Sequence, residues 1–295
     1  MNRKGIILAG GSGTRLHPIT TAMSKQMLPV YNKPMIYYPL SVLMLAGISD
    51  FLIISSPDDI GGFKKLFGTG EWLGINVTYA VQPKPDGIAQ ALIIAEAFLD
   101  GNASALVLGD NIFYGRNFSE TLRSAGQCLE GATIFTDGVS DPERYGVANL
   151  NSNGRVQSIE EKPCKPTSRQ AITGLYFYDE MAPEYAKSLK PSARGELEIT
   201  ALNQIYLQND ALQAERLGTG FAWFDAGTHD SLLEASMFIQ IIEKRLGVQI
   251  GCVEEISFNN GWIDAGQVGS LADRMGKNAY SSYLRSLLAS VKCND

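Results

Sequence analysis

Three glycines within four positions follow the first apolar segment of the chain. That segment, residues 4–8, is expected to be a buried strand, and it leads directly into Gly10, Gly11 and Gly13. Glycines let the backbone turn sharply and approach a ligand closely, and the exposed N–H groups of such a turn can hold phosphate oxygens. Arg15 follows, and its planar guanidinium is suited to phosphate. The loop therefore predicts a polyphosphate site; a glycine turn that merely joins a strand to a helix is the alternative.

Two common phosphate-binding motifs do not match this loop. The dinucleotide-binding fingerprint needs a third glycine three residues after the second, and Leu16 occupies that position. The Walker loop ends in Gly-Lys-Ser or Gly-Lys-Thr, which this loop lacks. A dinucleotide-dependent oxidoreductase is therefore a disfavoured alternative.

Two aspartates end apolar segments and are candidates for a metal site. Asp110 follows the run 105–108, and Asp225 follows the aromatic run 221–224. Mg²⁺ commonly takes one or two carboxylates together with phosphate oxygens and water. The alternative is that each aspartate caps a helix or a turn, as aspartates at such positions often do.

Other polar residues could contact a nucleotide or a sugar, although each also has a plain structural explanation. Gln82 follows the run 77–81, and its amide can match the imide edge of a pyrimidine. Lys162, beside two glutamates, could meet a second phosphate or form a surface ion pair. Arg194 precedes a predicted helix, and Tyr145 lies in a loop where it could cover a sugar ring or pack against the core.

Composition excludes several classes of protein. The net charge of −6 argues against a nucleic-acid partner. No apolar run approaches the roughly 20 residues needed to span a membrane, and no signal peptide is evident, so we expect a cytoplasmic protein. The chain has only two histidines, which argues against a metal centre with several histidine ligands and against a Ser-His-Asp hydrolase. No C-x-x-C pair occurs among the scattered cysteines, which are Cys128, Cys164, Cys252 and Cys293.

Short apolar runs alternate with helical spacing in the first half of the chain. The predicted strands are 4–8, 51–55, 77–81 and 105–108, and the predicted helices are 35–46, 58–66 and 88–98. This alternation is typical of an α/β fold with a mostly parallel sheet that is covered on both faces. Ligands of such sheets bind beyond the carboxyl ends of the strands, where both the glycine loop and Asp110 are expected.

The second half is richer in predicted strands. These are 133–135, 146–149, 156–159 and 171–178, with helices at 198–208 and 230–245. The apolar residues of the last helix are expected to pack in the core. The tail 268–291 looks helical, and the strongest domain boundary lies near Ile250. We therefore predict a core of residues 1–249 and a C-terminal, mainly helical appendage of residues 250–295.

The motifs, in this order, resemble those of the sugar-1-phosphate nucleotidylyltransferases, most closely the short bacterial glucose-1-phosphate thymidylyltransferase group. The resemblance extends from Gly5 to about Leu288 and is carried by segments 10–18, 24–29, 33–40, 85–87, 108–111, 160–163, 173–179, 194–200 and 227–230. It implies a Rossmann-like, doubly wound core with an inserted sugar-binding part. It also implies that dTTP and glucose 1-phosphate react, with Mg²⁺, to give dTDP-glucose and pyrophosphate.

The resemblance assigns a role to each matching residue. The implied catalytic residues are Arg15, Lys25, Asp110, Lys162 and Asp225, of which Asp110 and Asp225 would bind Mg²⁺. The implied nucleotide-binding residues are Gly10, Gly11, Gly13, Thr14, Arg15, Lys25, Gln26, Gln82, Gly87 and Asp110. The implied sugar-phosphate-binding residues are Asn111, Tyr145, Gly146, Glu161, Lys162, Ile172 and Arg194.

The resemblance further implies a homotetramer, a product that feeds dTDP-sugar synthesis such as that of dTDP-rhamnose, and feedback inhibition by a dTDP-sugar at a separate site. Thr219 stands where an arginine is common in that feedback site, and Lys84 adds a charge near the nucleotide pocket. The choice between dTTP and UTP, and the exact sugar 1-phosphate, stay open. A non-catalytic regulatory subunit of the same fold is a further alternative, disfavoured because every implied catalytic residue is present.

Overall fold

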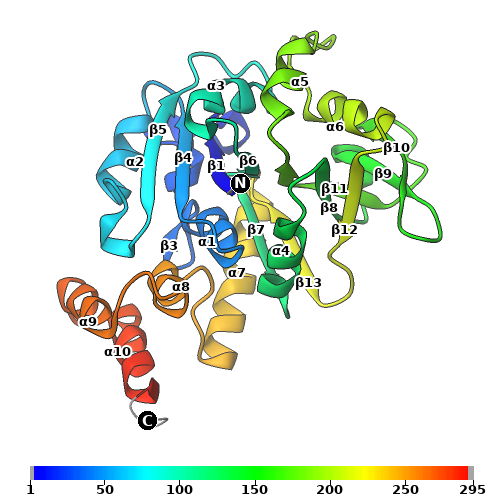
Figure 1. The fold of residues 1–295 in the computed structure, drawn as a ribbon. Helices are drawn as coiled ribbons and strands as arrows, with labels where there is room; N and C mark the ends of the chain where they lie inside the picture. Colours follow the sequence, from blue (N-terminus) through cyan, green and yellow to red (C-terminus); the bar gives the residue numbers. More distant parts are fainter. Residues whose placement is uncertain (1–2, 292–295) are drawn as a thin grey trace.

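A computed structural model describes residues 3–291 and is built around one nine-stranded sheet (Figure 1). Its parallel part consists of β1 (Arg3–Ala9), β4 (Asp50–Ser55), β5 (Asn76–Val81) and β6 (Ala103–Leu108). These strands are almost continuously apolar because both faces of the sheet are covered. The predicted strands of the first half are confirmed.

The sheet continues, without a break, into the second half of the chain. The long strand β11 (Gln170–Tyr178) pairs antiparallel with β6, so that Leu175 lies opposite Val107. Beyond it lie β8 (Ala132–Gly138), β9 (Gly146–Leu150), β10 (Val156–Glu161) and β12 (Leu212–Arg216). The order from one edge is β10-β9-β11-β6-β1-β4-β5, with β8 on β11 and β12 on β8.

Helices cover the two faces of the sheet and create two apolar cores. Alternate residues of a strand point to opposite faces. Ile7 of β1 packs in the core of α1 (Tyr37–Leu45), α2 (Ile60–Phe67) and α4 (Phe118–Gln127). Its neighbour Ile6 packs in the core of α3 (Gln90–Leu99), α5 (Ala182–Ser188) and α6 (Ile199–Gln208). Helix α4 and strands β7 and β12 were not predicted.

A small antiparallel pair, β7 (Asn111–Gly115) with β13 (Phe221–Asp225), lies next to the main sheet. It leads into the long helix α7 (His229–Leu246), which begins with a capping box at Thr228. The short strands β2 (Pro29–Val30) and β3 (Lys33–Pro34) pack against α7. Single 3₁₀ turns are η1 (Thr14–Leu16), η2 (Ile19–Thr21), η3 (Lys25–Met27), η4 (Glu71–Leu73) and η5 (Pro142–Arg144).

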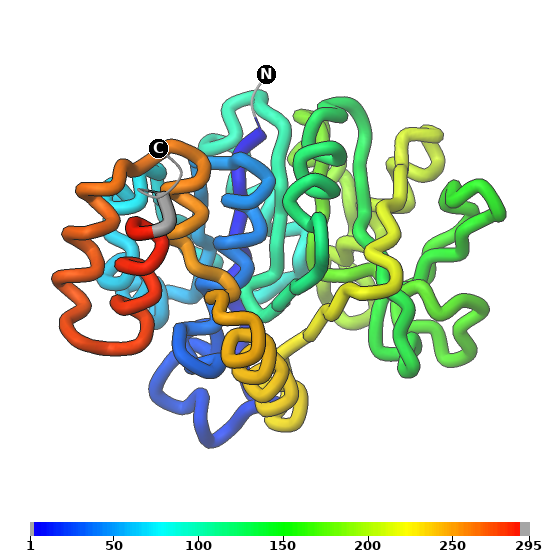
Figure 2. Tube along the Cα trace, turned by 90° about the horizontal axis from the view of Figure 1, so that it is seen from below, coloured from blue at the N-terminus to red at the C-terminus, as the bar shows by residue number. Residues whose placement is uncertain are grey.

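The C-terminal segment forms α8 (Val253–Asn259), α9 (Ala265–Arg274) and α10 (Ala279–Val291). Helices α9 and α10 lie at the opposite end of the molecule from β9 and β10 (Figures 1 and 2). The predicted helical tail is therefore two helices, separated at residues 275–278, with their own small apolar core. Within residues 3–291, Cys128, Cys164 and Cys252 are free thiols, and Cys293 lies outside the described part. No helix in the described part is long and apolar enough to cross a membrane.

Candidate active site

A cavity of about 520 Å³ opens at the carboxyl ends of β1 and β6 and runs along β9, β10 and β11. It brings together most of the predicted site residues, although they come from segments far apart in the chain. These are Gly10, Gly11, Arg15, Lys25, Gln26, Gln82, Gly87, Asp110, Asn111, Tyr145, Gly146, Glu161, Lys162, Ile172, Arg194 and Asp225. Gly13 lines a neighbouring cavity of about 390 Å³, and Thr14 lines neither of the two.

The glycine loop leaves space for two glutamines. A Cβ atom on residue 10 would lie 2.6 Å from Oε1 of Gln82, so only glycine fits there without moving that amide. Gln82 donates through Nε2 to Oε1 of Gln90 at 2.7 Å. Gln26 is buried, and its Nε2 donates to the carbonyl of Gly10 at 3.3 Å. Both amides are thus held in place beside the loop, with Gly11 in the left-handed region at φ 97°.

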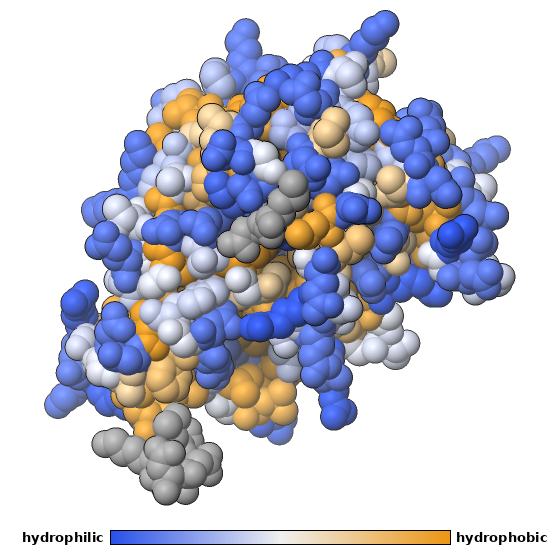
Figure 3. Space-filling model, viewed as in Figure 1, coloured by the Kyte–Doolittle hydropathy of each residue, from blue (hydrophilic) through white to orange (hydrophobic). Residues whose placement is uncertain are grey.

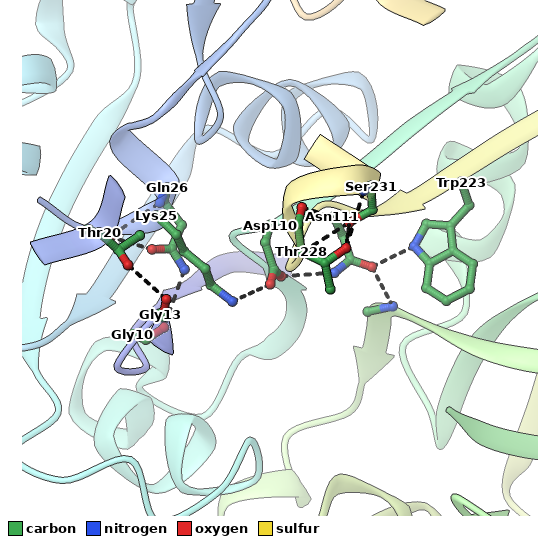
Figure 4. A network of polar contacts seen from close by, with 12 residues as sticks. Gly10, Gly13, Thr20, Lys25, Gln26, Asp110, Asn111, Trp223, Thr228 and Ser231 are labelled. Atoms are coloured by element: carbon green, nitrogen blue, oxygen red, sulfur yellow. Dashed lines mark hydrogen bonds and ion pairs between the residues drawn. The ribbon is translucent and has the colours of Figure 1, made fainter. Parts of the chain in front are cut away.

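Asp110 is at the centre of a polar network (Figure 4). Its Oδ2 accepts from the ammonium of Lys25, and its Oδ1 accepts from Nδ2 of Asn111 at 3.1 Å. The side-chain Oδ1 of Asn111 accepts in turn from the Gly174 N–H at 3.1 Å and from Nε1 of Trp223 at 2.6 Å. Burial raises the pKa of Asp110, but the Lys25 ammonium and the hydrogen bonds outweigh it and hold the pKa below its ordinary value.

Asp225 has no hydrogen bond or ion pair to another side chain in the described part of the chain. Burial and the nearby Asp110 carboxylate raise the pKa of Asp225, against the opposing influence of Arg15 and Lys25. Gly227 separates Asp225 from Arg15: a Cβ atom on residue 227 would lie 2.7 Å from Nη2 of Arg15 and 2.9 Å from Oδ1 of Asp225. Two carboxylates and two cations therefore share one end of the cavity.

Glu161 organises the other end of the cavity. Its Oε2 accepts from Oγ1 of Thr200 at 2.5 Å, and its Oε1 accepts from Nη2 of Arg194 at 3.1 Å. Nζ of Lys162 lies 3.7 Å from the same oxygen. The carboxylate thus contacts two cations that keep close to half of their side chains exposed to solvent, and Arg194 also pairs with Glu198 at 2.8 Å. The rings of Tyr145 and Trp223, which also line the cavity, are 5.0 Å apart.

The chain matches the family model described as "Nucleotidyl transferase" over residues 4–241. It belongs to this family. It is 57% identical to the glucose-1-phosphate thymidylyltransferase of Neisseria meningitidis serogroup A over 97% of this chain and 99% of the relative. It is 59% identical to that of Xanthomonas campestris pv. campestris over 97% of each chain. The chain is thus a nucleotidyltransferase of the glucose-1-phosphate thymidylyltransferase group, as its motifs predicted.

Solved structures support the same assignment of the fold. A Bacillus anthracis structure assigned as a glucose-1-phosphate thymidylyltransferase superposes with a TM-score of 0.74 at 44% identity, covering 80% of this chain and 94% of that one. A UDP-glucose pyrophosphorylase superposes with a TM-score of 0.73 at 22% identity, over 82% of this chain and 99% of the other. The second likeness concerns the fold alone.

Several residues of this transferase line the cavity but were not predicted from the sequence. They are chiefly Arg144, Tyr176, Glu198, Thr200 and Trp223. Trp223 had a usable signal, because alternate residues of a strand share a face and Asp225 is two positions away. Arg144 adjoins Tyr145, and its guanidinium lies 5.3 Å from that ring while Asp141 holds it by an exposed ion pair. Thr200 and Glu198 carry no such signal, because their roles depend on where Glu161 lies.

The carboxylates suit a hard divalent cation. No group of three or more His, Cys, Asp or Glu side chains in residues 3–291 could hold a metal by itself. Two aspartates are too few for a structural zinc site. They fit Mg²⁺, which binds through one or two carboxylates and takes its other ligands from phosphates and water. The unpartnered carboxylate of Asp225 is the free donor that such an ion requires.

Proposed function

We propose that this protein transfers the thymidylyl group of dTTP to glucose 1-phosphate, giving dTDP-glucose and pyrophosphate. One observation supports this most strongly: a single cavity contains two separate groups of cations. Arg15 and Lys25 lie beside Asp110 and Asp225, and Lys162 and Arg194 lie on Glu161. A reaction between a nucleoside triphosphate and a sugar phosphate needs two such anion-binding groups, because the two substrates repel each other.

The sugar phosphate would act as the nucleophile. One of its oxygens forms a bond to the α-phosphorus of dTTP, and the bond from that phosphorus to the oxygen of the β-phosphate breaks, so that pyrophosphate leaves with the electron pair. A phosphate monoester, with a second pKa of about 6, is largely a dianion at neutral pH and needs no base. Neither of the two histidines lines the cavity. Catalysis then depends on positioning and on cations placed where charge develops.

Asp110 and Asp225 would hold a divalent cation, which we propose to be Mg²⁺. When bound, the ion would neutralise charge on the phosphates and help to align them. Arg15 would stabilise the departing pyrophosphate, while Lys162 and Arg194 would orient the sugar phosphate. Gln26 and Gln82 would bind the imide edge of thymine, because an amide offers both a donor and an acceptor.

Pyrophosphate release, measured with Mg²⁺ across a matrix of nucleoside triphosphates and sugar 1-phosphates, tests the proposal. We expect release only when both substrates are present, and fastest with dTTP and glucose 1-phosphate. Uracil has the same imide edge as thymine, so UTP should react more slowly but measurably. Faster reaction with UTP would make the protein a uridylyltransferase. Release from dTTP alone would show that water, and not the sugar phosphate, is the acceptor.

We propose further that the protein forms a homo-oligomer, expected to be a tetramer, in which α7 pairs with α7 of a second copy. Leu233, Met237 and Ile241 are 59%, 53% and 54% exposed, and their spacing places them on one face of the helix. Figure 3 shows apolar surface at the lower edge of the molecule, where α7 lies. The face is suited to a twofold axis through Met237: antiparallel pairing brings Leu233 onto Ile241 and the acidic Asp230 onto the basic Lys244 of the other copy.

The mass in solution, measured by light scattering, tests this pairing. We expect Met237→Glu to lower the mass by a factor of about two, since a buried carboxylate at the axis would face its own copy. The control is Met181→Glu at the N-cap of α5, where the methionine is 40% exposed and lies outside α7. Equal masses for the wild type and the Met237→Glu variant would contradict the pairing.

Feedback inhibition at a separate site is the remaining part of the proposal. The product would feed dTDP-sugar synthesis, so an end product such as dTDP-rhamnose is the expected inhibitor. Thr219 stands in the turn between β12 and β13, outside the two cavities described above. Inhibition that more dTTP does not relieve would support a separate site, and purely competitive inhibition would contradict it.

A further inference from the structure

The two carboxylates at the proposed metal site differ in the groups that contact them, and Figure 4 shows the contacts of Asp110. Both oxygens of Asp110 are engaged, Oδ2 by the ammonium of Lys25 and Oδ1 by Nδ2 of Asn111. Asp225 makes no such contact within residues 3–291. A divalent cation that uses both aspartates would therefore find one of them already taken by a protein cation.

Asn111 is fixed in its place, but Lys25 is not. The side-chain amide of Asn111, which donates to Oδ1 of Asp110, is itself held by the Gly174 N–H and by the Trp223 indole. Lys25 has four rotatable side-chain bonds, begins the short turn η3 and retains some solvent exposure. In the described part, its ammonium has only this one ion pair. Of the two contacts on Asp110, the one with Lys25 is the contact that can be exchanged.

We propose that Lys25 and the divalent cation occupy Oδ2 of Asp110 in turn. In the free protein, the ammonium neutralises the buried carboxylate, which would otherwise be an unpaired charge. An arriving divalent ion would repel the ammonium at close range and displace it, because two cations held against one buried oxygen repel each other strongly. Lys25 is then free to bind the triphosphate that accompanies the ion. The inference rests on the proposed function and adds a coupling to it: binding of the divalent cation to Asp110 releases Lys25.

Mn²⁺ binding to the free protein, followed by electron paramagnetic resonance of the unbound ion, tests the exchange without any turnover. Lys25→Met removes the competitor and should tighten Mn²⁺ binding about tenfold, which is the factor expected when nine in ten molecules have the carboxylate occupied. Lys162→Met is the matched control: it removes one positive charge from the same cavity, but Lys162 contacts Glu161 and not Asp110. We expect a change of less than about twofold in that variant.

An Mn²⁺ affinity that is unchanged or weaker in Lys25→Met, or that changes equally in both variants, overturns the exchange. Asp110→Asn and Asp225→Asn test the metal site itself. If the wild type binds Mn²⁺ and both of these variants lose it, the metal site of the proposed function stands whatever Lys25→Met does.

A measurement on the wild-type protein avoids any effect of the substitution on folding. Acetylation of Lys25 by acetic anhydride, quantified by mass spectrometry, should increase several-fold when Mg²⁺ is added, because the released ammonium becomes accessible. Labelling of Lys162 should not change. Labelling of Lys25 that stays constant or falls with Mg²⁺ contradicts the proposal.

Discussion

Asp225 lies directly opposite Asn111 in the antiparallel pair of β13 and β7, so that its carboxylate is close enough to that of Asp110 for the two charges to interact. The Ala226 N–H donates to the Asp110 carbonyl at 3.0 Å and continues the pairing by one residue. Two acidic side chains that are 115 positions apart in the sequence are thus brought together by backbone hydrogen bonds. The rest of the chemistry proposed for this protein depends on that relationship.

Removing either carboxylate should reduce activity, but the two changes should affect stability in opposite directions. We expect Asp110→Asn and Asp225→Asn each to lower kcat by roughly 10²–10³. Without metal, Asp225→Asn should raise the melting temperature, because burial and Asp110 both disfavour its charge. Asp110→Asn should lower the melting temperature, because the folded state holds the pKa of Asp110 below its ordinary value and so stabilises the charge that the substitution removes. Thermal unfolding in EDTA measures the melting temperatures of both variants. Shifts of the same sign relative to the wild type would contradict this expectation.

Arg15 should be needed for the chemical step. With no carboxylate ion pair within 4.0 Å in the described part, its guanidinium is available for the leaving pyrophosphate. We expect Arg15→Ala to lower kcat by roughly 10²–10³, as does the loss of one placed donor elsewhere. Arg15→Lys should recover part of that loss. Steady-state kinetics with dTTP and glucose 1-phosphate provide the measurement, and near-normal turnover in Arg15→Ala would remove the proposed role.

Gly10→Ala should weaken nucleotide binding more than it weakens the fold. The added Cβ would lie 2.6 Å from Oε1 of Gln82 and would push that amide away from its position. We expect KM for dTTP to rise about tenfold, which is the loss of roughly one hydrogen bond, while kcat changes little. Gly61→Ala in α2, where a Cβ meets nothing within 4 Å, is the control. A KM for dTTP that stays the same in Gly10→Ala would place thymine elsewhere.

Glu243 should matter for stability although it is far from the cavity. It is 5% exposed, pairs with the buried Lys33 at 3.0 Å and accepts from the Ile250 N–H at 2.9 Å. We expect Glu243→Ala to cost about 3–5 kcal/mol, because it leaves a buried ammonium unpaired. Glu180→Ala, in the exposed turn before α5, should change the free energy of unfolding by less than about 0.5 kcal/mol. Chemical denaturation compares the two, and equal effects would contradict this role for Glu243.

Glu254 should make the stability of the C-terminal helices depend on pH. Burial raises the pKa of Glu254, while the hydroxyl of Tyr280, 2.5 Å away, works against that shift. A raised pKa means that the folded state favours the protonated form. The resulting stability is complete below the ordinary pKa of 4.5 and is lost as the pH rises through the raised value. Glu254→Gln should abolish this loss.

The comparison of melting temperature against pH for the wild type and Glu254→Gln is the measurement. The melting temperature of the wild type should fall relative to that of the variant as the pH rises above 4.5. A constant difference between the two proteins across that range would show that Glu254 does not titrate as described.

The parallel part of the sheet could be predicted because its strands are continuously apolar and separated by helical spacing. β7 could not, because it starts directly after Gly109-Asp110 and its pairing partner, β13, is more than a hundred residues away. The distinction between core and surface also failed on α7: Ala235 and Ile239 are buried as expected, but Leu233 and Leu246 are each 59% exposed. Spacing indicates which residues share a face and not what covers that face.

The candidate site, like the fold, could be predicted from the sequence only in part. The glycine loop, Asp110 and Gln82 could be located because each follows a recognisable strand. Lys162, Arg194 and Asp225 could be marked as candidates from their positions, but only the resemblance implied that they converge on one site. The fixing of Asn111 by Trp223 and Gly174 had no signal in the sequence, because it depends on contacts between three separate strands.

The position of a bound divalent ion tests the central claim most directly. Crystals grown with Mn²⁺ and dTDP-glucose allow the ion to be located by its anomalous scattering. The account predicts one peak within about 2.0–2.4 Å of carboxylate oxygens of both Asp110 and Asp225, with Lys25 turned away from Asp110. Bound dTDP-glucose in the cavity, with the ion elsewhere or contacting neither aspartate, would contradict it.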